Sequence, residues 1–131
     1  MLQYIAVTDH DIHNIDSGSA DFWVFSTGLP ANESANHTVF DPTKSSTFTS
    51  LSGYNFSIRY GDGSTASGTV GLDKVVIGGA TVTQQAVEMA TSVTQNFVDD
   101  TNLDGVMGLG FSNINNGTLL QPTCIPPLTN K

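Results

Sequence analysis

The residues best suited to chemistry lie between Asn14 and Val24, where Asp16 is followed at once by Ser17-Gly18-Ser19. Gly18 lets the chain turn sharply and expose its backbone N–H groups. A carboxylate in such a turn accepts hydrogen bonds from these amides and from the neighbouring hydroxyls, which fix its orientation. Taken alone, Asp-Ser-Gly is also typical of an ordinary turn between two strands, so both interpretations stay open at this point.

The elements that must hold this turn are predicted to be strands. Residues 22–25 are wholly apolar, as in a strand buried on both faces, whereas residues 56–60 alternate between apolar and polar. Residues 86–90 alternate as well, except that Ala86 and Val87 break the strict pattern. Two glycine-rich turns, Gly61-Asp62-Gly63-Ser64 and Gly78-Gly79, predict two hairpins. No segment has a sustained helical period, and at most one helical turn is expected near residues 42–48. The pattern predicts an all-β fold of short strands.

Length and charge exclude several classes of function. The 131 residues suffice for one domain with one modest core. With 4 Lys and Arg against 12 Asp and Glu, the net charge is -8. Phosphate backbones and anionic lipid repel such a chain, so we expect neither a nucleic-acid nor a membrane partner.

Several features favour a secreted protein. Asn-X-Ser/Thr triplets begin at Asn32, Asn36, Asn55 and Asn116. No apolar run is long enough to span a bilayer, and no secretory leader follows Met1. The single Cys124 rules out an internal disulfide framework. We therefore expect a mature extracellular protein whose leader is absent from this chain.

Three further blocks follow the Asp16 turn in order: residues 39–48, residues 60–68 and residues 104–110. Together the four blocks resemble the amino-terminal lobe of the pepsin-like aspartic proteases, in particular the secreted fungal branch. The resemblance covers residues 16–115. It implies one lobe of the pepsin-like (acid protease) double-psi barrel fold over residues 1–131, with residues 1–15 shortened and residues 112–131 a divergent tail.

The resemblance also implies roles around the aspartate. Asp16 would be one of two catalytic carboxylates, and Ser17 stands where the family usually has threonine. Gly18 would contribute an amide that holds the carboxylate pair. Ser19 would donate a hydroxyl hydrogen bond to the outer oxygen of Asp16.

Substrate-binding roles follow from the same resemblance. Tyr60 and Gly61 would lie in the flap that folds over substrate, with Tyr60 bonded to Trp23. Asp62 at the flap tip would accept a basic side chain next to the scissile bond. The apolar wall of the cleft would be formed by Phe97, Leu103 and Met107. The plain structural alternatives are a strand aromatic for Tyr60 and a core residue for Trp23.

The implied reaction is peptide-bond hydrolysis at acidic pH. Two carboxylates brought within about 3 Å cannot both ionise, so the pair holds one proton. The ionised member activates the attacking water and the protonated member donates to the peptide carbonyl. No cofactor and no metal is expected. His10, His13 and His37 lack the spacing of known metal sites and are interpreted as incidental.

Two departures from the family pattern leave two functions open. No second Asp-Thr/Ser-Gly motif occurs, and the 11 residues between Tyr4 and Asp16 are too few for the family's full hairpin. One interpretation is an aspartic endopeptidase whose second carboxylate comes from an identical subunit or from a separate carboxy-terminal lobe. The alternative is a non-catalytic remnant, or a peptide-binding module that keeps the flap and cleft wall.

Overall fold

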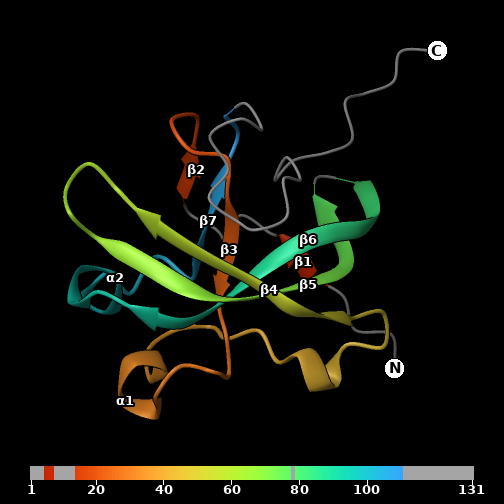
Figure 1. Ribbon diagram of the computed structural model, residues 1–131, viewed down its shortest axis with the longest axis horizontal. Coiled ribbons are helices and arrows are strands. Elements are labelled where there is room, and N and C mark those ends of the chain that lie inside the picture. Colours follow the sequence, from red (N-terminus) through yellow and green to blue (C-terminus); the bar gives the residue numbers. More distant parts are fainter. Residues whose placement is uncertain (1–4, 8–13, 78, 111–131) are drawn as a thin grey trace.

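The computed structural model describes residues 5–7, 14–77 and 79–110, and within them seven strands form one sheet (Figure 1). The elements in chain order are β1 (Ile5–Val7), β2 (Asn14–Asp16), β3 (Phe22–Phe25), α1 (Ala31–Ser34), the 3-10 turn η1 (Pro42–Lys44), β4 (Thr49–Arg59), β5 (Thr65–Ile77), β6 (Ala80–Val93), α2 (Gln95–Asp99) and β7 (Gly105–Gly108). In space the order is β1-β5-β6-β3-β7-β2. The prediction of an all-β fold is confirmed.

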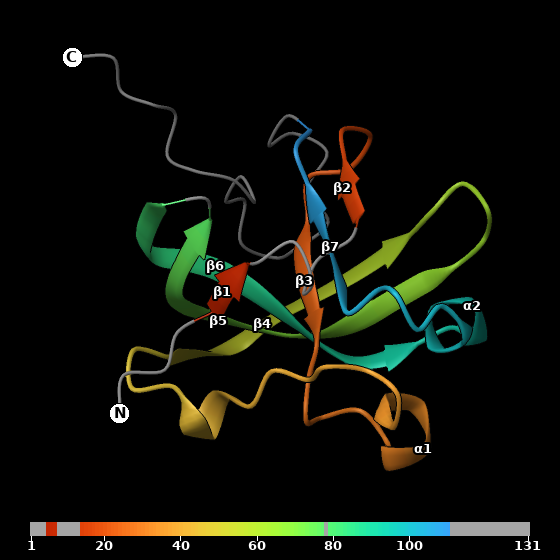
Figure 2. The ribbon, with the colours of Figure 1, turned by 180° about the vertical axis from the view of Figure 1, so that it is seen from behind.

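Both predicted hairpins are present. β4 and β5 pair in antiparallel fashion from Arg59↔Thr65 onward, and β5 pairs in the same way with β6. Gly63 and Gly79 adopt φ values of 89° and 85°, a left-handed conformation that glycine tolerates without strain. The β4–β5 hairpin reaches outward, and α2 lies beside it in both views of the ribbon (Figures 1 and 2).

The long strand β5 accounts for the branching of the sheet. One edge of β5 carries β6, while the other carries β4 along residues 65–72 and β1 along residues 75–77. β1 and β2 pair in parallel with β5 and β7, respectively. The rest of the shortened segment, the tail from residue 112, and with them His10, His13 and Cys124, lie outside the described residues.

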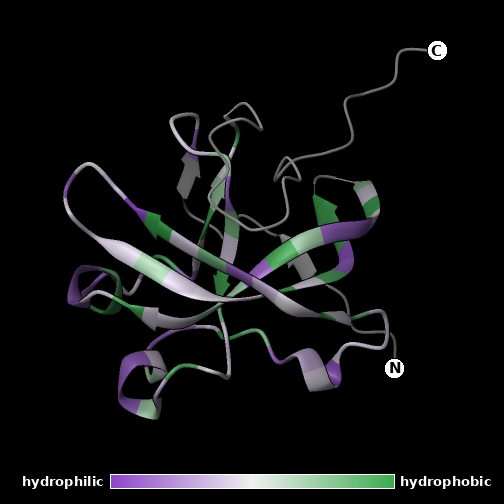
Figure 3. Cartoon of the chain, in the orientation of Figure 1, coloured by the Kyte–Doolittle hydropathy of each residue, from purple (hydrophilic) through white to green (hydrophobic). Residues whose placement is uncertain are grey.

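Apolar side chains pack on both faces of β3. Trp23 and Phe25 belong to one buried cluster, with Phe56, Val70, Ala90 and Val106 among its members. Phe22 and Val24 belong to the other, with Val75, Val87, Met89 and Met107. Successive side chains of a strand point to opposite faces, which explains why residues 22–25 are all apolar and all buried. In Figure 3, which colours each residue by its hydropathy, the green parts of the strands are hydrophobic residues.

Helical structure is brief. η1 lies within the predicted segment, and its first turn begins at Asp41, whose carboxylate accepts the Thr43 amide at 3.0 Å. α1 and α2 are not predicted from the sequence, because four or five residues cannot display a 3.6-residue period. Among the described residues, no helix is long and apolar enough to cross a membrane.

Candidate active site

Asp16 ends β2 and is fixed there through its backbone. It pairs with Gly108 of β7, and its carbonyl accepts the Leu109 amide at 2.7 Å. After the turn, the Ser19 carbonyl accepts the Gly110 amide at 2.6 Å. A Cβ on Gly108 would lie 2.5 Å from the Ser19 carbonyl oxygen, so only glycine permits this approach of the two segments. The end of β7 and the two residues that follow it therefore hold the turn that carries Asp16 by backbone hydrogen bonds at both of its ends.

The Asp16 carboxylate is oriented by the turn itself. Its Oδ1 accepts the Gly18 amide at 2.9 Å, and the side chain is half-buried beside the exposed Ser17 and Gly18. The expected hydrogen bond from Ser19 to Asp16 is wrong, because the buried Ser19 hydroxyl has no hydrogen-bond partner among the described residues. One backbone amide, rather than a set of hydroxyls, thus holds the carboxylate here.

Tyr60, at the start of the turn of the β4–β5 hairpin, forms an aromatic cluster with Trp23 and Phe97. The indole Nε1 of Trp23 donates to the Tyr60 hydroxyl at 2.8 Å, as the resemblance implies. The ring of Phe97 meets both rings edge to face, at centroid distances of 5.0 Å to Trp23 and 5.7 Å to Tyr60. Such contacts between aromatic rings add to the stabilisation from burial alone.

Tyr60 stays neutral over the whole acidic and neutral range. Burial first of all, together with the negative charges of Asp21, Asp16 and Glu88, raises the pKa of its phenol to about 12, although the Trp23 hydrogen bond lowers it. The phenol therefore keeps its hydrogen for donation throughout this range.

The three residues expected in the cleft wall do not lie together. Phe97 packs against the cluster that contains Trp23, and Leu103 is a buried member of it. Met107 instead packs with Phe22 in the other cluster. Val106 is the residue of β7 that pairs with Trp23, and the next side chain on a strand points to the opposite face. Met107 therefore packs on the other face of the sheet from Phe97 and Leu103, and its role in the cleft wall stays a prediction.

The hairpin tip holds an exposed carboxylate. Asp62 Oδ1 accepts both the hydroxyl and the amide of Ser64, at 2.5 and 2.9 Å. These hydrogen bonds, the hydroxyl one first, lower the pKa of Asp62 below its usual value. Asp62 consequently keeps its negative charge at a pH where ordinary carboxylates begin to take up protons.

Two buried acids near the site escape sequence analysis. Asp21 and Glu88 are 0% and 4% exposed, and Glu88 pairs across strands with Trp23. Burial raises the pKa of Glu88 to about 9, helped by the charge of Asp21 and by the hydrogen bond between the two carboxyls. The only available signal is a glutamate within the otherwise apolar stretch 86–90.

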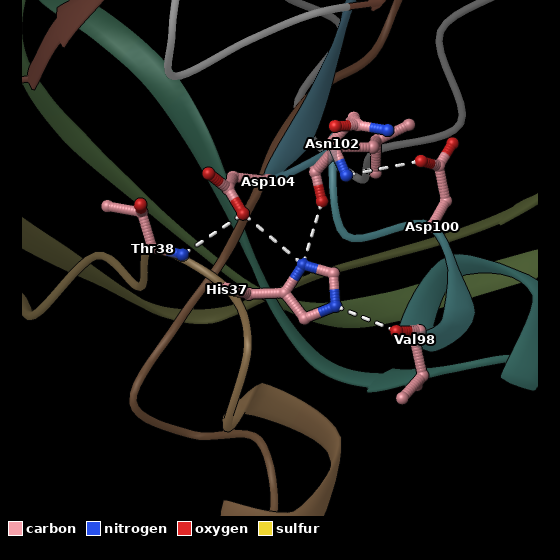
Figure 4. Close-up of polar contacts among 7 residues, drawn as sticks. His37, Thr38, Val98, Asp100, Asn102 and Asp104 are labelled. Atoms are coloured by element: carbon pink, nitrogen blue, oxygen red, sulfur yellow. Dashed lines mark hydrogen bonds and ion pairs between the residues drawn. The ribbon is translucent and has the colours of Figure 1, made fainter.

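His37 is also more than the incidental residue that the sequence suggests. Its ring is stacked on Phe25, with centroids 4.1 Å apart, and its nitrogens face Val98, Leu103 and Asp104 (Figure 4). A histidine within an Asn-X-Thr triplet gives no sequence signal of burial. Among the described residues, no three His, Cys, Asp or Glu side chains gather in a way that could hold a metal ion.

Comparison with known proteins finds one family model and several fungal relatives that match this chain. The model of the eukaryotic aspartyl protease family matches residues 12–129. The chain is 58% identical over 104 residues to an aspergillopepsin A-like aspartic endopeptidase of Aspergillus fumigatus, covering 79% of this chain and 24% of that protein. It is 54% identical to penicillopepsin-1 of Penicillium janthinellum and 49% identical to endothiapepsin of Cryphonectria parasitica, each over 102 residues. Those two alignments cover 78% of this chain and 31% and 24% of the relatives.

The alignments thus cover most of this chain but only a small part of each relative. The chain spans between about a quarter and a third of the length of these relatives, 24% to 31%. The family model nevertheless covers the Asp16 turn, the hairpin with Tyr60 and the β7 segment that clasps the turn. The chain belongs to the eukaryotic aspartyl protease family.

Proposed function

We propose that this chain supplies Asp16 as one of the two catalytic carboxylates of a secreted endopeptidase that works at acidic pH. The observation that carries the proposal is the setting of Asp16. Its backbone is clasped by β7, its Oδ1 is oriented by the Gly18 amide, and its side chain is only half-buried. A catalytic acid needs this combination of fixed orientation and access to substrate.

The reaction needs a second carboxylate close to Asp16. It comes from an identical subunit across a two-fold axis or from a separate carboxy-terminal lobe. The pair holds one proton. Its ionised member takes a proton from water as the water oxygen bonds to the peptide carbon, while its protonated member donates to the carbonyl oxygen. The C–N bond then breaks as the leaving nitrogen takes up a proton.

The substrate is a peptide or protein chain lying between Asp16 and the β4–β5 hairpin. Support comes from Tyr60, whose neutral hydroxyl and bond to Trp23 give the hairpin a fixed polar contact near Asp16. Phe97, which is partly buried, would offer an apolar wall to the side chains of the peptide, with the buried Leu103 packed in the cluster behind it. Ser17, Gly18 and Gly61 would line the same path, since all three are exposed.

Asp62 would select a basic side chain next to the scissile bond. Its carboxylate is exposed and its pKa is lowered by Ser64, so it remains charged in acid. For Asp62→Asn we expect kcat/KM toward a lysine-containing peptide to fall about tenfold, the effect of one charge-assisted contact. The matched peptide with leucine at that position should be cleaved at an unchanged rate. Equal losses on both peptides would contradict the assignment.

The proposal is tested by cleavage of a denatured protein substrate at pH 3 to 5 over a range of chain concentrations. If two copies form the site, activity should rise faster than linearly with concentration, because only the dimer has two carboxylates. If a carboxy-terminal lobe is needed, cleavage should appear only when that lobe of a fungal relative is added. No cleavage under either condition would overturn the proposal and favour a peptide-binding module.

A further inference from the structure

The buried ring of His37 faces oxygen atoms at both of its nitrogens. The side chain is 1% exposed. Its Nδ1 lies 2.9 Å from the Leu103 carbonyl oxygen and 3.2 Å from Asp104 Oδ1, and its Nε2 lies 3.0 Å from the Val98 carbonyl oxygen. Figure 4 shows the ring held between these partners, which come from both sides of it.

These partners determine which form of the ring fits. A carbonyl oxygen only accepts hydrogen bonds, and neutral imidazole carries a hydrogen on one nitrogen alone. Either neutral form would therefore turn a nitrogen lone pair toward a buried carbonyl at 3.0 Å or less. Only the imidazolium, with hydrogens on both nitrogens, satisfies both carbonyls. Asp104 Oδ1, which also accepts the Thr38 amide at 3.0 Å, then provides the balancing charge.

The His37 contacts fix the segment that carries part of the proposed cleft wall. Val98 belongs to α2, next to Phe97, and Leu103 lies between α2 and β7. His37 itself lies in the connection after α1. Its ring stacks on Phe25 and so anchors this connection to β3. The three hydrogen bonds thus join two stretches of chain that are more than sixty residues apart in the sequence.

We propose that His37 is a positioning residue: its imidazolium form fixes α2 and with it Phe97 and Leu103, and loss of the proton releases this wall. The inference goes beyond the proposed function, since it does not require that the chain cleave peptides.

The charged groups around the ring favour the cation. Asp104 is the direct partner, and the other acids of the elements packed against His37 are Glu33 of α1, Asp99 of α2 and the adjacent Asp100. Asp99 accepts from Gln95 and Asp100 from the Asn102 amide. Residues 22–40 and 94–105 contain no lysine or arginine. No neighbouring cation therefore opposes protonation of the ring from these segments.

The need for this proton determines the direction of the pH effect. The folded chain needs the second ring proton to satisfy both carbonyls. The wall should therefore be fixed in acid and released when the ring gives up that proton at higher pH. The same geometry would keep the wall in place throughout acidic conditions.

Two measurements on the 131-residue chain test this proposal. The first is the ¹⁵N shift of the His37 ring nitrogens at pH 5, assigned by loss of the signals in His37→Gln. We expect both nitrogens to be protonated. A folded chain with one unprotonated ring nitrogen at pH 5 would overturn the proposal, and this readout needs no folded variant.

The second measurement is the fluorescence of Trp23, the single tryptophan, against pH from 5 to 8. It is made in the Glu88→Gln background, so that the acid pair beside Trp23 does not contribute. We expect a change in emission with pH that disappears in His37→Gln and occurs at lower pH in Asp104→Asn, which removes the charge that balances the ring. His10→Gln/His13→Gln serves as the control and should keep the transition. An unaltered transition in His37→Gln would contradict the proposal.

Discussion

Replacing Asp16 with asparagine should reduce peptide cleavage by about 10²- to 10⁴-fold, the usual contribution of general acid–base catalysis. The asparagine amide still accepts the Gly18 hydrogen bond that holds Asp16 Oδ1 at 2.9 Å. It cannot take a proton from water, however, and cannot share one with a second carboxylate. The change should therefore remove catalysis while leaving the turn intact. The measurement is the initial rate of cleavage at acidic pH, under whichever condition the wild-type chain is active.

Glu33→Gln is the matched control for Asp16→Asn. It also converts one carboxylate to an amide, but Glu33 lies on the short helix α1, outside the turn that carries Asp16 and outside β7. Its cleavage rate should stay within about twofold of wild type. Binding of a substrate peptide should survive in Asp16→Asn, because the hairpin and the aromatic cluster are unchanged. A variant that keeps about a tenth or more of the activity would rule out Asp16 as a catalytic acid.

Local sequence signals carry most of the fold. The two hairpins can be predicted because their turns contain glycines that adopt positive φ, at Gly63 and Gly79, between strands of alternating pattern. The apolar run from Phe22 to Phe25 likewise indicates burial on both faces, and each face has its own core cluster. Such features depend on a few neighbouring residues, so the sequence displays them directly.

Features that depend on strand pairing or on contacts between distant residues cannot be predicted from a few neighbouring residues. The face on which Met107 lies depends on the register that aligns Val106 with Trp23. The expected bond from Ser19 to Asp16 is absent, and no neighbouring residue in the sequence indicates that this buried hydroxyl lacks a partner among the described residues. His37 meets partners more than sixty residues away in sequence, Val98 at a separation of 61. No pattern of neighbouring residues in the sequence predicts such contacts.

Glu88 and His37, two of the buried titratable groups that sequence analysis misses, both need an additional proton in the folded chain. Glu88 needs a proton to lie buried beside Asp21, and His37 needs a second ring proton to satisfy two carbonyls. Both groups therefore favour a folded chain in acid. Their effects remain separable, because they belong to different packed regions: β6 beside Trp23 for one, and the α1–α2 junction for the other.

Glu88→Gln should remove most of the loss of stability that the wild-type chain suffers as the pH rises. The pKa of Glu88 is raised from 4.5 to about 9 in the folded chain, by burial first and then by Asp21. Between these values the folded chain binds more protons than the unfolded chain does. The stabilisation is therefore complete below pH 4.5 and is lost as the pH rises toward 9, at up to about 1.4 kcal/mol per pH unit.

The loss amounts to about 3 kcal/mol between pH 4.5 and pH 7, a large part of the stability of a small domain. Glutamine keeps the shape of the side chain and an N–H that donates to Asp21, but it has no proton to lose. The measurement is the free energy of unfolding by urea at pH 4, 5.5 and 7, for the wild type, Glu88→Gln and the control Glu33→Gln on α1. The free energy of the control should fall with pH as that of the wild type does, whereas the Glu88→Gln curve should be nearly flat. If all three lines run parallel, the buried acid pair is not what ties this fold to acidic conditions.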